Sequence, residues 1–154
     1  MPKPSELILP DAAATTATGA ALGPLLRAGD VVTLSGSLGM GKTSFARGLL
    51  ASLGLQEDAP SPSFALVIAY EPPEVSLPVW HVDLYRLQDP DEALELGLED
   101  ALGDSALLIE WPEHGAMRWP QALALRFAAE GEGRRLTWAA GPAWAERWPP
   151  APFL

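Results

Sequence analysis

Cysteine is absent from this 154-residue chain, and lysine and histidine are scarce. The absence of thiols excludes disulfides, thiolate metal sites, iron–sulfur ligation and cysteine redox catalysis. The two histidines, His81 and His114, are too few for a histidine-rich zinc site. Chemistry in this protein must therefore rest on carboxylates, hydroxyls, backbone groups and the few cations.

Long hydrophobic runs and positive charge are also missing. No apolar run approaches the roughly 20 residues that a helix needs to span a bilayer, and Pro10 interrupts the short apolar run near the start, unlike a secretory signal. We therefore expect no membrane association and a cytoplasmic location. The formal net charge is −10 and the pI is near 4.5. Because such a surface repels a phosphate backbone, we expect the chain not to bind nucleic acid alone.

Apolar patterning predicts a single domain over residues 1–154, with an irregular proline- and tryptophan-rich tail at 141–154. In the first third, strands at 6–9 and 31–35 alternate with helices at 12–27 and 42–53, the first helix being capped by Asp11. Later segments predict an antiparallel hairpin (65–70 and 77–84), one or two short helices within 89–102, a central strand at 106–111 and a second hairpin within 121–140. This order indicates an α/β fold with a sheet of mixed direction.

The stretch GSLGMGKTS carries the strongest functional signal. Gly36, Gly41, Lys42 and Thr43 satisfy the phosphate-loop pattern G-x-x-x-x-G-K-[ST]. A predicted strand precedes the stretch and a predicted helix follows it, as a phosphate cradle requires. The glycines let backbone N–H groups turn inward, the helix N-terminus favours negative charge, Lys42 supplies a cation, and Thr43 offers a hydroxyl to Mg²⁺. The Met40 side chain is expected mainly to pack.

Two carboxylates follow predicted strands and qualify as partners of the loop. Glu110 ends the apolar run ALLIE, and Asp83 follows VWHV. One of them is expected to hold Mg²⁺ and the other to orient water or a mobile segment. A surface carboxylate is the plain alternative for Glu110, and a cap or an ion pair with Arg86 for Asp83. His81 alternates in phase with Asp83, but a packed strand histidine is its simpler interpretation.

Five segments in register, GSLGMGKTSFARGLL, SPSFALVIAYE, HVDLYRL, ELGLEDAL and IEWPE, make the chain resemble the TsaE (YjeE) family over about residues 7–140. The resemblance implies a P-loop NTPase-like three-layer fold with a mixed central sheet flanked by helices. It implies a bacterial ATPase needed for the threonylcarbamoyladenosine modification of tRNA adenosine 37. It also implies partners of the TsaB and TsaD type, tRNA contact only through that complex, and an ATP cycle that resets the complex without transferring the group.

The same resemblance assigns roles to individual residues. It implies nucleotide contacts from the loop residues Gly36, Ser37, Leu38, Gly39, Met40, Gly41, Lys42, Thr43 and Ser44. Thr43 and Glu110 would hold Mg²⁺, and Asp83 would be the second acid needed for activity. Ser63 belongs to the segment SPSF, which resembles a switch near the γ-phosphate, while Trp111 would lie beside the site and Thr15 near the adenine. The family usually carries aspartate where this chain has Ser37, and threonine where it has Ser63.

Three interpretations stay open at this point. Arg134 and Arg135, in the late hairpin, could reach a phosphate or a base edge, or could be exposed charges. A P-loop small-molecule kinase is one rival function, although the eight arginines are scattered rather than grouped as a lid. A nucleotide-gated binding module with negligible hydrolysis is the other.

Overall fold

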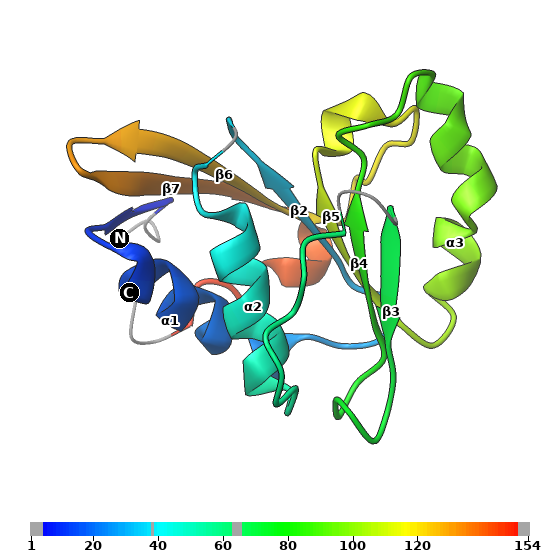
Figure 1. Ribbon diagram of the computed structural model, residues 1–154, viewed down its shortest axis with the longest axis horizontal. Coiled ribbons are helices and arrows are strands. Elements are labelled where there is room, and N and C mark those ends of the chain that lie inside the picture. The colour runs from blue at the N-terminus through cyan, green and yellow to red at the C-terminus, as the bar shows by residue number, and fades with distance from the viewer. Residues whose placement is uncertain (1–4, 38, 63–65, 151–154) are drawn as a thin grey trace.

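A computed structural model describes residues 5–37, 39–62 and 66–150. Seven strands form one sheet in the order β1-β7-β6-β2-β5-β4-β3 (Figure 1). The strands are β1 (Glu6–Leu9), β2 (Val31–Ser35), β3 (Val67–Tyr70), β4 (Val79–Asp83), β5 (Ala106–Glu110), β6 (Leu123–Glu130) and β7 (Gly133–Ala140). Strand β2 runs parallel to β5 and β6, and β4 runs parallel to β5, whereas β1, β3 and β7 pair antiparallel with their neighbours. The predicted mixed α/β sheet is confirmed.

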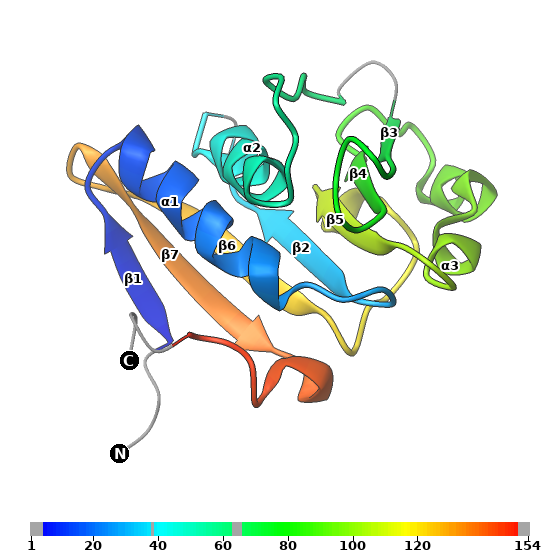
Figure 2. The same ribbon diagram turned by 90° about the horizontal axis from the view of Figure 1, so that it is seen from below.

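Helices cover both faces of the sheet. Helices α1 (Ala12–Leu22) and α2 (Lys42–Ser52) lie on one face, and the 3₁₀ helix η2 (Pro90–Leu96) and α3 (Leu98–Ala101) lie on the other, over β4 and β5 (Figures 1 and 2). One apolar cluster fills the space beneath α1 and α2, and a second lies beneath η2 and α3. Along β4 and β5 alternate residues belong to different clusters, so the side chains of Val79, His81 and Asp83 face the α2 side together with Ala106, Leu108 and Glu110.

Helix α1 begins as predicted and ends early. The Asp11 carboxylate accepts the Ala14 N–H at 2.8 Å, which is the expected N-cap. The helix stops at Leu22 instead of residue 27, and a 3₁₀ turn, η1 (Gly23–Leu25), follows it. Pro24 has no N–H to continue the helical hydrogen bonds, which explains the change of geometry.

The close approach of α1 to α2 depends on two glycines. A Cβ at Gly48 would lie 2.0 Å from the Thr16 carbonyl oxygen, and a Cβ at Gly19 would lie 2.1 Å from that of Phe45. No side chain fits at either position, so the two helix backbones touch directly. This contact fixes where α1 stands relative to the start of α2.

The later elements follow the predicted order. The hairpin β3–β4 is antiparallel and shorter than expected, since β3 starts at Val67 and Leu66 has a positive φ of 66°. Residue 65, its predicted first residue, lies outside the described residues. The segment 89–102 holds η2 and α3, β5 is an inner strand between β2 and β4, and β6–β7 form the second hairpin. No helix within the described residues has the length and apolar character needed to cross a membrane.

The tail after β7 packs into the core. The short 3₁₀ helices η3 (Pro112–His114) and η4 (Pro142–Trp144) are the last helical elements among the described residues. Trp144 and Trp148 are fully buried in the cluster beneath α1. Arg147 forms a two-pronged ion pair with Asp30, with both N···O distances at 2.7 Å, and stacks on Trp144. Trp144 and Trp148 of the tail are therefore part of the core.

Candidate nucleotide site

The glycine-rich loop joins the end of β2 to the start of α2. Gly36, Gly39 and Gly41 all have positive φ, at 135°, 78° and 100°. At Gly36 the requirement is also steric, because a Cβ there would lie 2.4 Å from the Phe127 carbonyl oxygen. A loop of this conformation directly before a helix N-terminus is the arrangement that binds phosphate. Leu38, one of the predicted contact residues, lies outside the described residues, and Ser37 is exposed.

Lys42 is the buried cation of the site, with 5% of its surface exposed. Its ammonium donates to the Gly36 carbonyl oxygen and lies 3.6 Å from the centre of the Trp111 ring. Burial lowers the pKa of this ammonium below its usual 10.5, while the negative charges of Glu110, Glu113 and Asp83 act in the opposite direction. The amine is thus held at the loop by a carbonyl and an aromatic face, both weaker partners than a phosphate.

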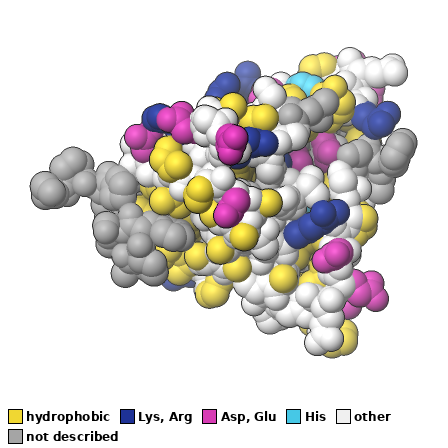
Figure 3. Space-filling view, turned by 60° about the vertical axis from the view of Figure 1, so that its left-hand side comes forward, with side chains coloured by type: hydrophobic (Ala, Val, Ile, Leu, Met, Phe, Trp, Pro, Cys, Tyr) yellow, Lys and Arg dark blue, Asp and Glu magenta, His cyan; other side chains and the backbone are white. Residues whose placement is uncertain are grey.

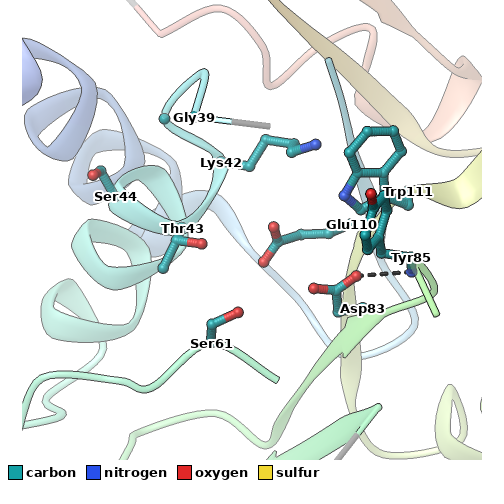
Figure 4. A pocket seen from close by; sticks show the side chains of 10 residues that line it. Gly39, Lys42, Thr43, Ser44, Ser61, Asp83, Tyr85, Glu110 and Trp111 are labelled. Atoms are coloured by element: carbon teal, nitrogen blue, oxygen red, sulfur yellow. Dashed lines mark hydrogen bonds between the residues drawn. The ribbon is translucent and has the colours of Figure 1, made fainter. Parts of the chain in front are cut away.

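The two predicted carboxylates meet Lys42 in a cavity of about 270 Å³ at the N-terminus of α2. Asp83 and Glu110 are direct neighbours across β4 and β5, and both are nearly buried. Figure 4 shows the Thr43 hydroxyl and both carboxylates pointing into the same space, with Ser61 facing them from the segment after α2. The lining residues are Gly39, Gly41, Lys42, Thr43, Ser44, Ser61, Asp83, Tyr85, Glu110 and Trp111.

Each carboxylate also accepts a hydrogen bond from another group of the protein. One Asp83 oxygen accepts the Tyr85 N–H at 2.9 Å (Figure 4). The Oε2 atom of Glu110 lies 2.7 Å from Nε2 of His81, which is completely buried. The predicted packed histidine therefore also binds an acid of the site. The sequence signal was the shared face of His81 and Asp83 on one strand, but the partner of His81 lies on the next strand.

Aromatic side chains form the wall of the cavity beside Lys42. Trp111 directly follows β5, and its backbone N–H donates to the Leu34 carbonyl oxygen at 3.1 Å. Its backbone has φ 57° and ψ 51°, a conformation that is rare for a bulky residue. Its ring contacts Tyr85 and His114, at centroid distances of 4.9 Å and 5.1 Å. Tyr85 is 41% exposed and was not predicted as a site residue, although it lies two residues after Asp83 in HVDLYRL.

A second cavity, of about 140 Å³, lies on the α1 side of the same loop. Thr15 reaches it from α1, and its Cγ2 lies 3.2 Å from where a Cβ of Gly41 would stand. Arg134 reaches it from β7 and donates to the Gly39 carbonyl at 3.0 Å. Arg135 instead pairs with Glu6 and Glu130 and does not line either cavity. The remaining predicted residue, Ser63, lies outside the described residues.

The chain matches the family model for "Threonylcarbamoyl adenosine biosynthesis protein TsaE" over residues 9–136. The chain belongs to the TsaE family. A TsaE protein of Treponema pallidum is 36% identical over 121 residues, which cover 76% of this chain and 87% of that protein. A TsaE protein of Mycobacterium tuberculosis is 36% identical over 143 residues, which cover 86% of this chain and 85% of that protein.

Among solved structures, Bacillus subtilis YdiB matches this TsaE-family chain with a TM-score of 0.76 and 28% identity. The match covers 92% of this chain and 88% of YdiB. The predicted family and the fold class are thus both confirmed. The family model covers residues 9–136, and all the residues that line the two cavities, from Asp11 to Arg134, lie within this range.

Proposed function

We propose that this chain is a Mg²⁺-dependent ATPase subunit that acts in the formation of threonylcarbamoyladenosine in tRNA. Membership of the TsaE family supports the role in this modification. The observation that carries the ATPase activity is the meeting of Lys42, Thr43, Asp83 and Glu110 in one cavity at the mouth of a phosphate loop. A loop without the acids would bind phosphate, whereas the acids add the means to hold a metal and position water.

The phosphates of ATP would occupy the space between the loop and the two acids. Backbone N–H groups of the loop and the N-terminus of α2 would bind the phosphate oxygens, and the Lys42 ammonium would leave its carbonyl and aromatic partners for the β- and γ-phosphates. Losing two weak partners and gaining an anion favours this transfer, because a buried ammonium is stabilised most by a charged partner.

The donor set of the cavity fits Mg²⁺. Oxygen ligands are those that Mg²⁺ prefers, and it is normally held by one or two carboxylates together with substrate phosphates. Thr43 and Glu110 would hold it here, and Asp83 would orient the attacking water. When bound, Mg²⁺ supplies positive charge that offsets the charge on the transferring phosphoryl group. Among the described residues there is no group of three or more acids, histidines or cysteines that could hold a metal.

The nucleoside of ATP would extend into the second cavity. Thr15 and Arg134 line it, and Gly39 and Gly41 of the loop form the partition between the two cavities. The Arg134 guanidinium already contacts the loop and stands beside the space where the nucleoside would enter. This arrangement places the phosphates at the acids and the base at α1.

Partners of the TsaB and TsaD type would make the tRNA contact in the cytoplasm. The net charge of −10 opposes direct binding of RNA. On the face shown in Figure 3, Lys and Arg side chains are scattered among acidic and apolar ones and do not join into a broad positive surface. The chain would thus contribute an ATP cycle that resets the complex, and the threonylcarbamoyl transfer would take place on another subunit.

A small-molecule kinase is the weaker alternative. Phosphoryl transfer to a metabolite commonly uses arginines around the transferring group. In the described part of the chain, no arginine lines the cavity that contains Lys42 and the acids, and Arg134 lies on the other side of the loop. Nothing in that cavity therefore favours a kinase over a hydrolase.

Reconstitution with TsaB-like and TsaD-like proteins tests the proposal. Modified tRNA is counted per complex over many turnovers for the wild type, Glu110→Gln and the matched control Glu57→Gln, whose exposed side chain lies outside both cavities and is not among the charges acting on Lys42. We expect Glu110→Gln to bind nucleotide and to stop after about one turnover, and Glu57→Gln to continue. Normal modification by Glu110→Gln would show that hydrolysis is not the role of this subunit, and tight salt-sensitive tRNA binding by the isolated chain would contradict the indirect role.

A further inference from the structure

His81 is buried in a way that packing alone does not explain. None of its surface is exposed, and its Nδ1 atom has no hydrogen-bond partner among the described residues. Two of its neighbours on the same sheet face are apolar, Val79 two residues before it on β4 and Leu108 opposite it on β5. An aliphatic side chain would fill this position without leaving a buried polar atom unpaired. The compensating feature is the single bond from Nε2 to Glu110.

The bond crosses the sheet diagonally. His81 pairs with Leu108 in register, and Glu110 lies two residues further along β5 on the same face. With an ionised carboxylate as its partner, Nε2 must carry the hydrogen and donate it to Oε2. This commits one oxygen of Glu110 to the interior of the sheet and leaves Oε1 as the oxygen that can serve the cavity.

Glu110 has two neighbours that could otherwise move it. Asp83 stands directly opposite and repels it, and the Lys42 ammonium attracts it, as the effect of Glu110 on the pKa of Lys42 indicates. A Glu110 carboxylate that swung onto Lys42 would occupy the cation that the phosphates need. The bond to His81 opposes both movements, because it holds the carboxylate from the side away from the loop.

We propose that His81 is a positioning residue that holds Glu110 in the orientation needed for the metal and keeps it off Lys42. This inference rests on the proposed function, because it assigns a support to the carboxylate that would bind Mg²⁺. Metal-binding carboxylates commonly need such a hydrogen-bonded support, and its loss typically weakens metal affinity about 10- to 100-fold. His81 lines neither cavity, so it would touch neither the nucleotide nor the metal.

The test compares His81→Leu, which removes the donor, with His81→Gln, whose side-chain amide can still donate to Glu110. Binding of a non-hydrolysable ATP analogue is measured without Mg²⁺ and across a Mg²⁺ titration. We expect the wild type to bind more tightly with Mg²⁺, and His81→Leu to need at least tenfold more Mg²⁺ for half of that increase. The Mg²⁺-free affinity of His81→Leu should also fall, because a released Glu110 carboxylate would turn toward Lys42. His81→Gln should recover most of the difference.

The outcomes separate the inference from the function beneath it. If Mg²⁺ does not change the nucleotide affinity of the wild type, the proposed function is contradicted. If the wild type responds to Mg²⁺ and His81→Leu responds in the same way, the positioning role is overturned. An equal loss of Mg²⁺-free affinity in His81→Leu and His81→Gln also overturns it, because that pattern indicates a packing role.

A measurement on unmodified His81 covers the case in which His81→Leu does not fold. The imidazole nitrogen resonances are recorded by NMR with the analogue, before and after Mg²⁺, and the His114→Gln variant identifies which signals belong to His81. We expect the Nε2–H signal of His81 to shift on Mg²⁺ addition, and this shift to disappear in Glu110→Gln. A His81 signal that does not respond to Mg²⁺ in the wild type overturns the proposal.

Discussion

Replacing Gly48 with alanine tests how the α1–α2 contact supports the nucleotide site. Gly48 lies in the interior of α2, where alanine is favoured over glycine by about 1 kcal/mol on helix propensity alone. At this position the new Cβ would lie 2.0 Å from the Thr16 carbonyl oxygen, against 3.4–4 Å for an ordinary contact. The helices would have to separate by more than 1 Å, so packing and propensity act with opposite signs.

The size of the effect follows from these two terms. Overpacking of a filled interior costs about 1–3 kcal/mol, and the upper end applies because the opposing atom belongs to a helix backbone and cannot rotate away. After the propensity gain is subtracted, Gly48→Ala should lower the free energy of unfolding by about 2 kcal/mol. For a chain of this length that corresponds to a Tm lower by roughly 4–8 °C.

Urea unfolding of Gly48→Ala and of the control Ala51→Gly measures both terms. Ala51 is exposed on the same helix, so its replacement by glycine reports the propensity term without a clash, a loss of about 1 kcal/mol. Nucleotide affinity should also fall in Gly48→Ala, because Thr15 on α1 contacts the loop at Gly41. If Gly48→Ala raised the stability by about 1 kcal/mol, propensity would dominate and the reasoning from the contact would be refuted.

Three further predictions concern the ion pair of the tail and the buried lysine. Arg147→Met should lower the free energy of unfolding by about 3–5 kcal/mol, since it leaves Asp30 buried without its cation, and adding Asp30→Asn should recover part of this loss in thermal or urea unfolding. Nucleotide affinity, measured by calorimetry, should fall as the pH rises above the lowered pKa of free Lys42, because bound phosphate raises that pKa. Lys42→Met should show no such dependence, and a flat wild-type profile would count against a cation at the phosphates. Nucleotide binding should change the tryptophan fluorescence of the wild type and not of Trp111→Phe, because the Lys42 ammonium leaves the Trp111 ring; an equal change in both would place the signal on another tryptophan.

Local patterns in the sequence were sufficient to predict the glycine-rich loop and the two acids that meet it in one cavity. The loop depends on glycines at fixed spacing and on one lysine, and both acids directly follow short apolar strands, so neighbours along the chain carry the information. That Asp83 and Glu110 lie side by side follows once β4 and β5 are parallel neighbours. The resemblance to the TsaE family supplied the fold class beyond this local order.

Contacts between distant segments were not predictable from one sequence. The bond between His81 and Glu110 depends on the register of β4 and β5, and the sequence of neither strand alone specifies that register. Helix α1 was predicted too long because the apolar residues Leu25 and Leu26 continue past Leu22, whereas the geometry changes at Gly23 and Pro24. Likewise, the ion pair of Arg147 joins positions 117 residues apart, so the sequence of the tail alone did not predict this contact.

The pairing of β1 with β7 also bears on how the protein is made. The ribosome makes β2, the glycine-rich loop, Asp83 and Glu110 well before it makes β7. Strand β1 is made first, but its partner β7 is formed from residues 133–140, near the end of the chain. A chain still emerging from the ribosome can therefore assemble the phosphate loop with both acids before Arg134 arrives to contact Gly39. Vectorial synthesis would thus complete the side of the pocket that we propose for the metal first and the side that we propose for the nucleoside last, when the first and last strands along the chain pair.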